Sequence, residues 1–207
     1  MAPAKSVGKL QVGRALWYIA PGQVEVRPER LEVPGPGDAL VRTLFSGISR
    51  GTERLVSQGL VPESEWERMR ATMQAGAFPF PVKYGYCATG IVEAGPPDSI
   101  GRTVFCLFPH QDRFVVPLER LAAIPEAVPA RRATLAANME TALNAHWDAG
   151  TGPGDRIVVV GAGVVGLLVA RIAARLPGAQ VTVVDIDADR RDIVTRMGAA
   201  FAPPDAA

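Results

Sequence analysis

Residues 156–166 read Arg-Ile-Val-Val-Val-Gly-Ala-Gly-Val-Val-Gly, and residues 181–185 read Val-Thr-Val-Val-Asp. The β-branched run Ile157–Val160 predicts a strand that is buried on both faces. Apolar residues then recur at helical spacing as far as Pro177-Gly178, which predicts a helix that ends there. Val181–Val184 is a second buried run, and Asp185 follows it. The stretch therefore predicts a strand–helix–strand unit, around which the rest of the 207-residue chain is organised.

Three glycines at G-x-G-x-x-G spacing join the first strand to the helix. The first permits a tight turn, the second lets a pyrophosphate approach the backbone, and the third lets the helix pack closely on the strand. The helix N-terminus offers free N–H groups and a positive dipole end to phosphates, and the acid is placed to bind a ribose hydroxyl. We therefore predict a dinucleotide site; the alternative is a glycine-packed unit that binds nothing. The predicted residues are Gly161, Gly163, Val164, Val165, Gly166 and Asp185.

The first part of the chain has mostly two-residue periodicity and many Pro-Gly turns, which predicts an irregular β-barrel or sandwich. A capping box at Ser64 predicts a helix over Glu65–Gln74. After Pro129 the composition changes, and helices are expected over Ala130–Ala149 and Asp189–Met197. We therefore expect two domains, 1–128 and 129–207. The expected strands of the first domain are Ala15–Ile19, Gln23–Arg27, Ala39–Phe45, Ala88–Glu93, Thr103–Phe108 and Asp112–Val116.

Composition narrows the class of protein. The net charge of +1 gives no reason to expect nucleic acid or a membrane surface as a partner. Cys87 and Cys106 are too few for a disulfide scaffold or a four-cysteine zinc loop, which favours a reduced, cytoplasmic protein. The longest apolar run, Ile157–Ala170, is too short to span a bilayer.

The strand content of the last part is low for a complete dinucleotide fold, which has two halves of three strands. This sequence supplies two strands and the beginning of a third, so the first strand is expected to leave an apolar edge open. We expect that the chain is a fragment of a longer one, or that a partner or a second copy completes the sheet.

Further motifs carry a resemblance to a known family. Taken together, they resemble the medium-chain dehydrogenase/reductase superfamily, the zinc-type alcohol dehydrogenases and their relatives. The resemblance implies an α/β chain in which a GroES-like β-barrel precedes a partial Rossmann domain, a doubly wound parallel sheet. It implies hydride transfer between a nicotinamide and a carbonyl, alcohol or activated alkene. The Gly-Ile-Ser-x-Gly-Thr-Glu segment resembles the branch that includes bacteriochlorophyllide dehydrogenases. The motifs are Pro36–Val41, Gly47–Glu53, Gly85–Val92, Gly101–Val104, Glu140–Ala142 and Gly152–Ile157.

The three zinc-ligand positions of that family depart from its pattern. They hold Ser49, Tyr86 and a residue near Ala137 instead of the usual Cys, His and Cys or Glu. A catalytic zinc needs about three protein ligands, so no zinc is expected. The alternative is a zinc enzyme with shifted ligands, drawn from Cys87, Glu53 and His110.

Without zinc, other side chains must polarise a carbonyl and deliver a proton. The resemblance places Tyr86 beside the nicotinamide, where its phenol either donates to the developing alkoxide or fills the vacated metal cavity. Ser49 either binds substrate or is a small filler, and Glu53 either lines the pocket or stabilises a turn. His110 is read as a loop histidine with local hydrogen bonds, and His146 as structural.

Coenzyme selectivity follows from charge. Asp185 favours NAD because its carboxylate repels a 2′-phosphate, while Arg190 and Arg191 keep NADP possible. By resemblance Arg190 reaches the adenosine ribose, Arg50 contacts the pyrophosphate or is a solvated surface residue, and Thr141 lies under the nicotinamide. Met139 and Trp147 are expected in the core. The rival to an enzyme of small molecules is a non-catalytic nucleotide-binding or scaffold protein.

Overall fold

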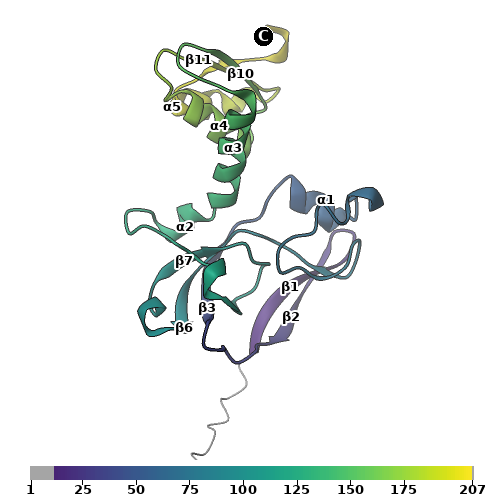
Figure 1. Cartoon of the computed structure of the whole chain (residues 1–207). Coiled ribbons are helices and arrows are strands. Elements are labelled where there is room, and N and C mark those ends of the chain that lie inside the picture. Colours follow the sequence, from purple (N-terminus) through teal and green to yellow (C-terminus); the bar gives the residue numbers. More distant parts are fainter. Residues whose placement is uncertain (1–11, 207) are drawn as a thin grey trace, which may run out of the picture. The chain divides into compact units, whose positions relative to one another are not determined.

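The computed structural model describes residues 12–206, which divide into two compact units, Met1–Leu135 and Ala136–Ala207 (Figure 1). Each unit is described by itself. Within the described residues, none of the helices is long and apolar enough to cross a membrane.

Two antiparallel sheets build the first unit (Figure 1). An isolated bridge between Ala15 and Gln111 joins segments of the two. Residues 12–135 thus form two sheets, and no closed barrel is found among them. One sheet has the order β2-β1-β5-β4, with β1 Val12–Ala20, β2 Gln23–Arg30, β4 Ala75–Gly76 and β5 Val82–Lys83. The other has the order β8-β3-β6-β7-β9, with β3 Asp38–Ser46, β6 Ala88–Ala94, β7 Thr103–Cys106, β8 Arg113–Pro117 and β9 Ala122–Ala123.

Two hydrophobic clusters hold this unit together. In the five-stranded sheet, Phe108 stacks on Phe114 with ring centroids 4.0 Å apart, among buried valines of β3, β6 and β7. The second cluster packs Tyr18 of β1 and Val82 of β5 against Val56 of helix α1, Thr52–Gln58. The alternation of buried residues along β7 and β8 is the expected result of one sheet face meeting the core.

The expected helix over Glu65–Gln74 is wrong. Only the 3₁₀ turn η1, Glu63–Glu65, forms there, followed by turns. Separate turn hydrogen bonds form there instead of a continuous helical ladder. Side chains add to them, because Trp66 Nε1 donates to the carbonyl of Val61 and the Tyr84 hydroxyl donates to the carbonyl of Met69. The helix of this region is instead α1, Thr52–Gln58, which ends at Gly59 in the left-handed region. The other short elements are η2 Pro97–Ser99, η3 Leu118–Arg120 and α2 Ala130–Ala133.

The second unit is a parallel three-stranded sheet in the order β10-β11-β12, partly covered by helices. Helix α4 packs against β10 and β11, and α5 against β12. The expected helix over Ala130–Ala149 is divided into α2 and α3, and the helix expected from Asp189 begins with the 3₁₀ turn η4. The elements are α3 Ala136–Ala149, β10 Arg156–Val160, α4 Val164–Ala173, β11 Gln180–Val184, η4 Ala188–Arg190, α5 Arg191–Met197, β12 Ala200–Ala202 and η5 Pro204–Ala206.

Strand β10 is buried on one face only, which corrects the expectation of burial on both. Val159 is buried in the core of the unit, whereas Val158 and Val160 are 63% and 84% exposed. Strand β10 also lies at the edge of the described sheet. The first strand therefore carries the open apolar edge that the sequence predicted.

Candidate functional site

The glycine segment between β10 and α4 has the geometry that its sequence demands. Gly161 has φ +98°, and its N–H donates to the carbonyl of Val184 at 2.7 Å. Gly163 is the N-terminal cap of α4, so the free N–H groups of the first helical turn follow it. A Cβ on Gly166 would lie 1.9 Å from the carbonyl oxygen of Gly161, so only glycine fits there.

Asp185 is tied to this glycine segment. One oxygen of its carboxylate accepts the N–H of Ala162, and the other accepts the N–H of Asp187 at 2.8 Å. These two backbone donors, Ala162 first, hold the pKa of Asp185 below its usual range. The acid is therefore ionised beside the loop, as a ribose-binding carboxylate must be. For a dinucleotide, the backbone of Gly161–Gly166 would hold the pyrophosphate and the Asp185 carboxylate would accept a hydroxyl of the adenosine ribose.

Both arginines after Asp185 have partners in the structure. Arg190 Nε lies 3.1 Å from the carboxylate of Asp187, and the Arg191 guanidinium lies 4.7 Å from the ring centroid of Phe201. Asp187 and Asp189 add negative charge to the same turn. The surroundings of the ribose site are thus unfavourable for a 2′-phosphate.

Helix α3 carries the remaining predicted residues of the second unit. The exposed Thr141 donates its hydroxyl to the carbonyl of Ala137 at 3.1 Å. Met139 and Trp147 are 40% and 69% exposed, so their prediction as core residues is wrong; they lie on the side of α3 that no described element covers closely. His146 is buried and bonds to Thr151 and to the carbonyl of Val169, so it links α3 to α4.

In the first unit, Glu53 is the centre of a buried polar cluster. Its side chain is 2% exposed and accepts the Ser49 N–H at 2.8 Å, the Tyr18 hydroxyl at 2.8 Å and His110 Nε2 at 2.6 Å. His110 in turn lies 2.5 Å from the Ser46 hydroxyl. Its bonds reach elements distant in sequence, which corrects the reading of His110 as a loop histidine with local bonds.

The segment 84–87 lies against this cluster. A Cβ on Gly85 would lie 3.0 Å from His110 Nε2, which places the peptide before Tyr86 against the histidine. The half-buried Tyr86 ring meets Tyr84 edge-on at 6.2 Å. Ser49 is half-buried, whereas Arg50 is exposed on the turn before α1. The structure therefore brings Glu53, Ser49 and the Tyr86 segment together around His110.

These donors do not fit a zinc ion. Both oxygens of Glu53 already accept hydrogen bonds, one from Tyr18 and His110 and the other from the Ser49 N–H. Among residues 12–206, no group of three or more His, Cys, Asp or Glu side chains is arranged to hold a metal ion.

Sequence reasoning missed Ser46 and Tyr18, and no local motif marks them. They join the polar cluster only in the folded protein, because Tyr18 lies on β1 and Ser46 is the last residue of β3, while His110 follows β7. The pairing of β3 with β6 through Ser46 and Ala88 brings the end of β3 beside the segment of Tyr86 and Cys87.

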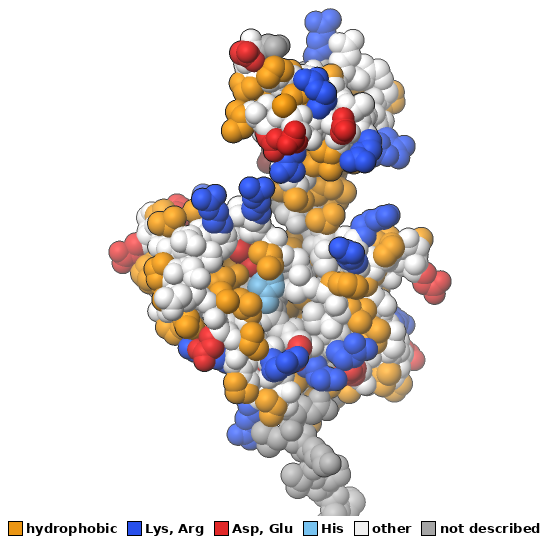
Figure 2. Space-filling model, turned by 180° about the vertical axis from the view of Figure 1, so that it is seen from behind, with side chains coloured by type: hydrophobic (Ala, Val, Ile, Leu, Met, Phe, Trp, Pro, Cys, Tyr) orange, Lys and Arg blue, Asp and Glu red, His pale blue; other side chains and the backbone are white. Residues whose placement is uncertain are grey.

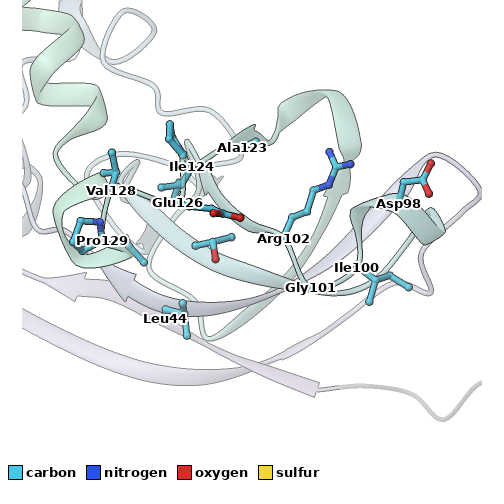
Figure 3. A pocket seen from close by; sticks show the side chains of 13 residues that line it. Leu44, Asp98, Ile100, Gly101, Arg102, Ala123, Ile124, Glu126, Val128 and Pro129 are labelled. Carbon is cyan, nitrogen blue, oxygen red and sulfur yellow. The ribbon is translucent and has the colours of Figure 1, made fainter.

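A groove of about 810 Å³ lies elsewhere on the first unit (Figure 3). Its labelled side chains come from β3 (Leu44), from the loops around η2 and β9 and from the approach to α2; the charged residues that line it are Asp98, Arg102 and Glu126. It contains none of the predicted site residues. The groove is therefore not the candidate site, which consists of the buried polar cluster and the glycine loop.

Surface charge adds little to the site. Figure 2 shows basic and acidic side chains scattered over both units on the face it presents, with no continuous region of one sign. This agrees with the net charge of +1.

Comparison with known proteins shows which class of protein this chain is similar to. Residues 134–204 match the family model "Alanine dehydrogenase/PNT, C-terminal domain". The chain is 30% identical over 194 residues to the 2-desacetyl-2-hydroxyethyl bacteriochlorophyllide A dehydrogenase of Cereibacter sphaeroides, covering 83% of this chain and 56% of that protein. It is 25% identical over 201 residues to D-xylulose reductase A of Aspergillus niger, covering 85% and 56%. The chain thus spans a little over half the length of these curated relatives.

Solved structures share the fold. An E. coli short chain alcohol dehydrogenase complexed with NADH superposes with a TM-score of 0.75 at 17% identity, covering 93% of this chain and 63% of that one. The quinone oxidoreductase of Thermus thermophilus superposes with a TM-score of 0.71 at 20% identity, covering 92% and 59%. Fold and site together define an α/β protein with a dinucleotide-type glycine loop. The comparisons support the medium-chain dehydrogenase/reductase superfamily, which this chain resembles in sequence and in fold.

Proposed function

We propose that this chain is part or all of a zinc-independent, NAD-preferring oxidoreductase that moves a hydride between the nicotinamide and a carbonyl or alcohol. The observation that carries the proposal is the glycine loop whose Ala162 N–H is bound by the ionised Asp185. Residues 1–128 are proposed as the GroES-like catalytic domain and residues 129–207 as the Rossmann part. Activated alkenes are a second substrate class.

The relatives support an alcohol or ketone as substrate. The names of the two curated relatives refer to a hydroxyethyl group and to xylulose, a sugar with hydroxyl and carbonyl groups. Bound nicotinamide would supply the hydride acceptor or donor. The chain's own residues would bind and orient the dinucleotide, through Gly161, Gly163, Val164, Val165, Gly166 and Asp185, with Arg190, Arg50 and Thr141 as further proposed contacts.

NAD rather than NADP is proposed on charge. A 2′-phosphate would meet Asp185 and the neighbouring Asp187, and Arg190 is already paired with Asp187. The negative charges of these carboxylates and of a 2′-phosphate would repel one another and oppose binding.

Tyr86 is proposed to stabilise the developing alkoxide through its phenol hydrogen. Tyr86→Phe is therefore expected to lower kcat by about 10²–10³, the usual cost of removing one oxyanion donor. The measurement is NADH absorbance during turnover of a panel of ketones, aldehydes and enones. Tyr84→Phe is the matched control, because the Tyr84 hydroxyl donates to the carbonyl of Met69 and its loss should affect stability alone. An unchanged kcat in Tyr86→Phe would favour the cavity-filling role.

Two rivals give different results in the same assays. A non-catalytic nucleotide-binding protein would bind NADH yet leave every compound of the panel unchanged. A zinc enzyme with ligands drawn from Cys87, Glu53 and His110 would contain stoichiometric zinc in metal analysis of the purified protein.

The open edge of β10 supports a further polypeptide partner. Its exposed Val158 and Val160 and its unpaired backbone groups are a template for another strand. We propose that a second copy or a further segment of chain covers this edge. Sedimentation velocity should show concentration-dependent association of the 207-residue chain that Val160→Lys weakens; a monomer at all concentrations would contradict association.

A further inference from the structure

The hydrogen bonds around His110 form one continuous chain. It begins at the half-buried Ser46 hydroxyl, passes through both ring nitrogens of His110 and ends at the buried carboxylate of Glu53. The two contacts are 2.5 Å and 2.6 Å long. A serine, a histidine and an acid in this order form the arrangement that moves protons in many unrelated enzymes.

The donors and acceptors fix the direction of this chain. An ionised Glu53 has only acceptors, so the hydrogen of the 2.6 Å contact belongs to His110 Nε2. The neutral imidazole then has a free lone pair at Nδ1, which accepts the Ser46 hydroxyl. Tyr18 and the Ser49 N–H complete the set of donors to Glu53. With the proton on Nε2, each polar atom of the cluster has a hydrogen-bond partner.

The other titratable groups of the cluster stay neutral. Burial, followed by the charge of Glu53, raises the pKa of Tyr18 far above its usual value, and burial raises that of Tyr84 to about 12. Burial likewise raises the pKa of Cys87 to about 12. The nearby Lys83 is held by Glu29 at 3.2 Å and by Gln111 at 3.0 Å. A proton that enters from Ser46 therefore has His110 as its acceptor and Glu53 as the countercharge.

We propose that Ser46, His110 and Glu53 are the proton-transfer chain of the oxidoreductase, with the Ser46 hydroxyl as the end that meets substrate. This inference rests on the proposed function. When an alcohol is oxidised, its C–H bond would break and bound nicotinamide would supply the acceptor for the hydride with both electrons. Its O–H proton passes to Ser46 Oγ while the proton of Ser46 passes to His110 Nδ1, and the C=O bond forms. Reduction of a ketone runs the same steps in reverse.

In this proposal, the hydrogen-bonded residues Ser46, His110 and Glu53 have a different role from Tyr86. The Tyr86 phenol would hold the substrate oxygen by a hydrogen bond, whereas the net proton would pass through Ser46. Ser46 is thus the catalytic residue, and His110 and Glu53 act through it as positioning residues. Glu53 fixes the tautomer, orients the imidazole and stabilises the imidazolium that forms.

The first test needs no turnover. The chain has two histidines, so ¹⁵N-detected NMR of the whole chain gives one signal set for His110 and one for His146 as an internal reference. We expect His110 to carry its proton on Nε2 at neutral pH and to gain the second proton at Nδ1 on acidification. A resting tautomer with the proton on Nδ1 would overturn the proposal, because Ser46 could then not donate to it.

The second test uses His110→Gln and Ser46→Ala. Glutamine can keep the hydrogen bond to Glu53 but cannot carry a proton, so His110→Gln should fold and bind NADH like the wild type. We expect it to lower kcat at least tenfold and to remove the acidic limb of the kcat/KM pH profile, and Ser46→Ala to do the same. Tyr86→Phe should lower kcat and leave the profile in place. A wild-type rate and profile in His110→Gln would overturn the inference.

The two proposals fail separately. If His110 has the expected tautomer but the protein binds no nucleotide, the proposed function is refuted. The NMR result would then still support the hydrogen bonds of the cluster. A chain that turns over substrate with an unchanged profile in both variants refutes the proton-transfer inference alone.

Discussion

Replacing Gly166 with alanine is expected to destabilise the second unit by roughly 1–3 kcal/mol, the usual cost of forcing an atom into a packed site. The new Cβ would lie 1.9 Å from the carbonyl oxygen of Gly161, which is backbone and cannot rotate away. Helix α4 must then move off the loop, and the N–H groups that face the pyrophosphate move with it. We therefore expect NADH binding to be lost together with stability, as measured by fluorescence titration and thermal unfolding.

Gly163→Ala is the matched control for this prediction. Gly163 has φ −73°, and a Cβ there meets nothing within 4 Å, so alanine fits the fold. If the pyrophosphate approaches the backbone at Gly163, the methyl group should weaken NADH binding without lowering the melting temperature. A Gly166→Ala variant that unfolds and binds like the wild type would contradict the packing argument.

Replacing Glu53 with alanine is expected to cost the first unit about 3 kcal/mol or more. Three donors, Tyr18, His110 and the Ser49 N–H, would lose their acceptor inside the protein, and each buried group left unpaired costs about 1–3 kcal/mol. The expected fall in melting temperature is on the order of 10 °C.

Glu93→Ala is the comparison for Glu53→Ala. The Glu93 carboxylate bridges Arg42 at 2.7 Å and Arg113 at 2.9 Å, but its side chain is 30% exposed. Surface ion pairs contribute about 0–1 kcal/mol, so this variant should unfold close to the wild type. If the two substitutions lowered the melting temperature equally, the burial of Glu53 would not be the source of the effect of Glu53→Ala.

The glycine-rich unit was predictable because its information is local. The tight turn, the close packing of the helix on the strand and the acid after the second strand each need a particular residue, and all lie within about 30 positions. Gly161, Gly166 and Asp185 accordingly lie where the pattern predicts, in a strand–helix–strand unit. The resemblance to the dehydrogenase superfamily rests on such local motifs too.

Elements that depend on tertiary contacts were predicted less well. The capping box at Ser64 is a true helix signal, yet bonds from Trp66 and Tyr84 to backbone carbonyls stabilise turns there instead. The one-sided burial of β10 reflects which neighbours the sheet has, which a β-branched run does not encode.

The polar cluster shows the same limit. Glu53 and His110 lie 57 residues apart in sequence and meet at 2.6 Å. Glu53 was a candidate by resemblance, but its partner Tyr18 and the hydroxyl of Ser46 could be found only from the strand pairing.

The measurement that tests the central claim most directly is a fluorescence titration of the 207-residue chain with NADH and, separately, with NADPH, on the wild type and on Asp185→Ala. We expect saturable binding of NADH, weaker binding of NADPH, and at least a tenfold loss of NADH affinity in the variant, because a ribose ligand and the bond to Ala162 are both removed. NADPH bound as tightly as NADH, or NADH binding that Asp185→Ala leaves unchanged, would contradict the assignment of this loop as an NAD site.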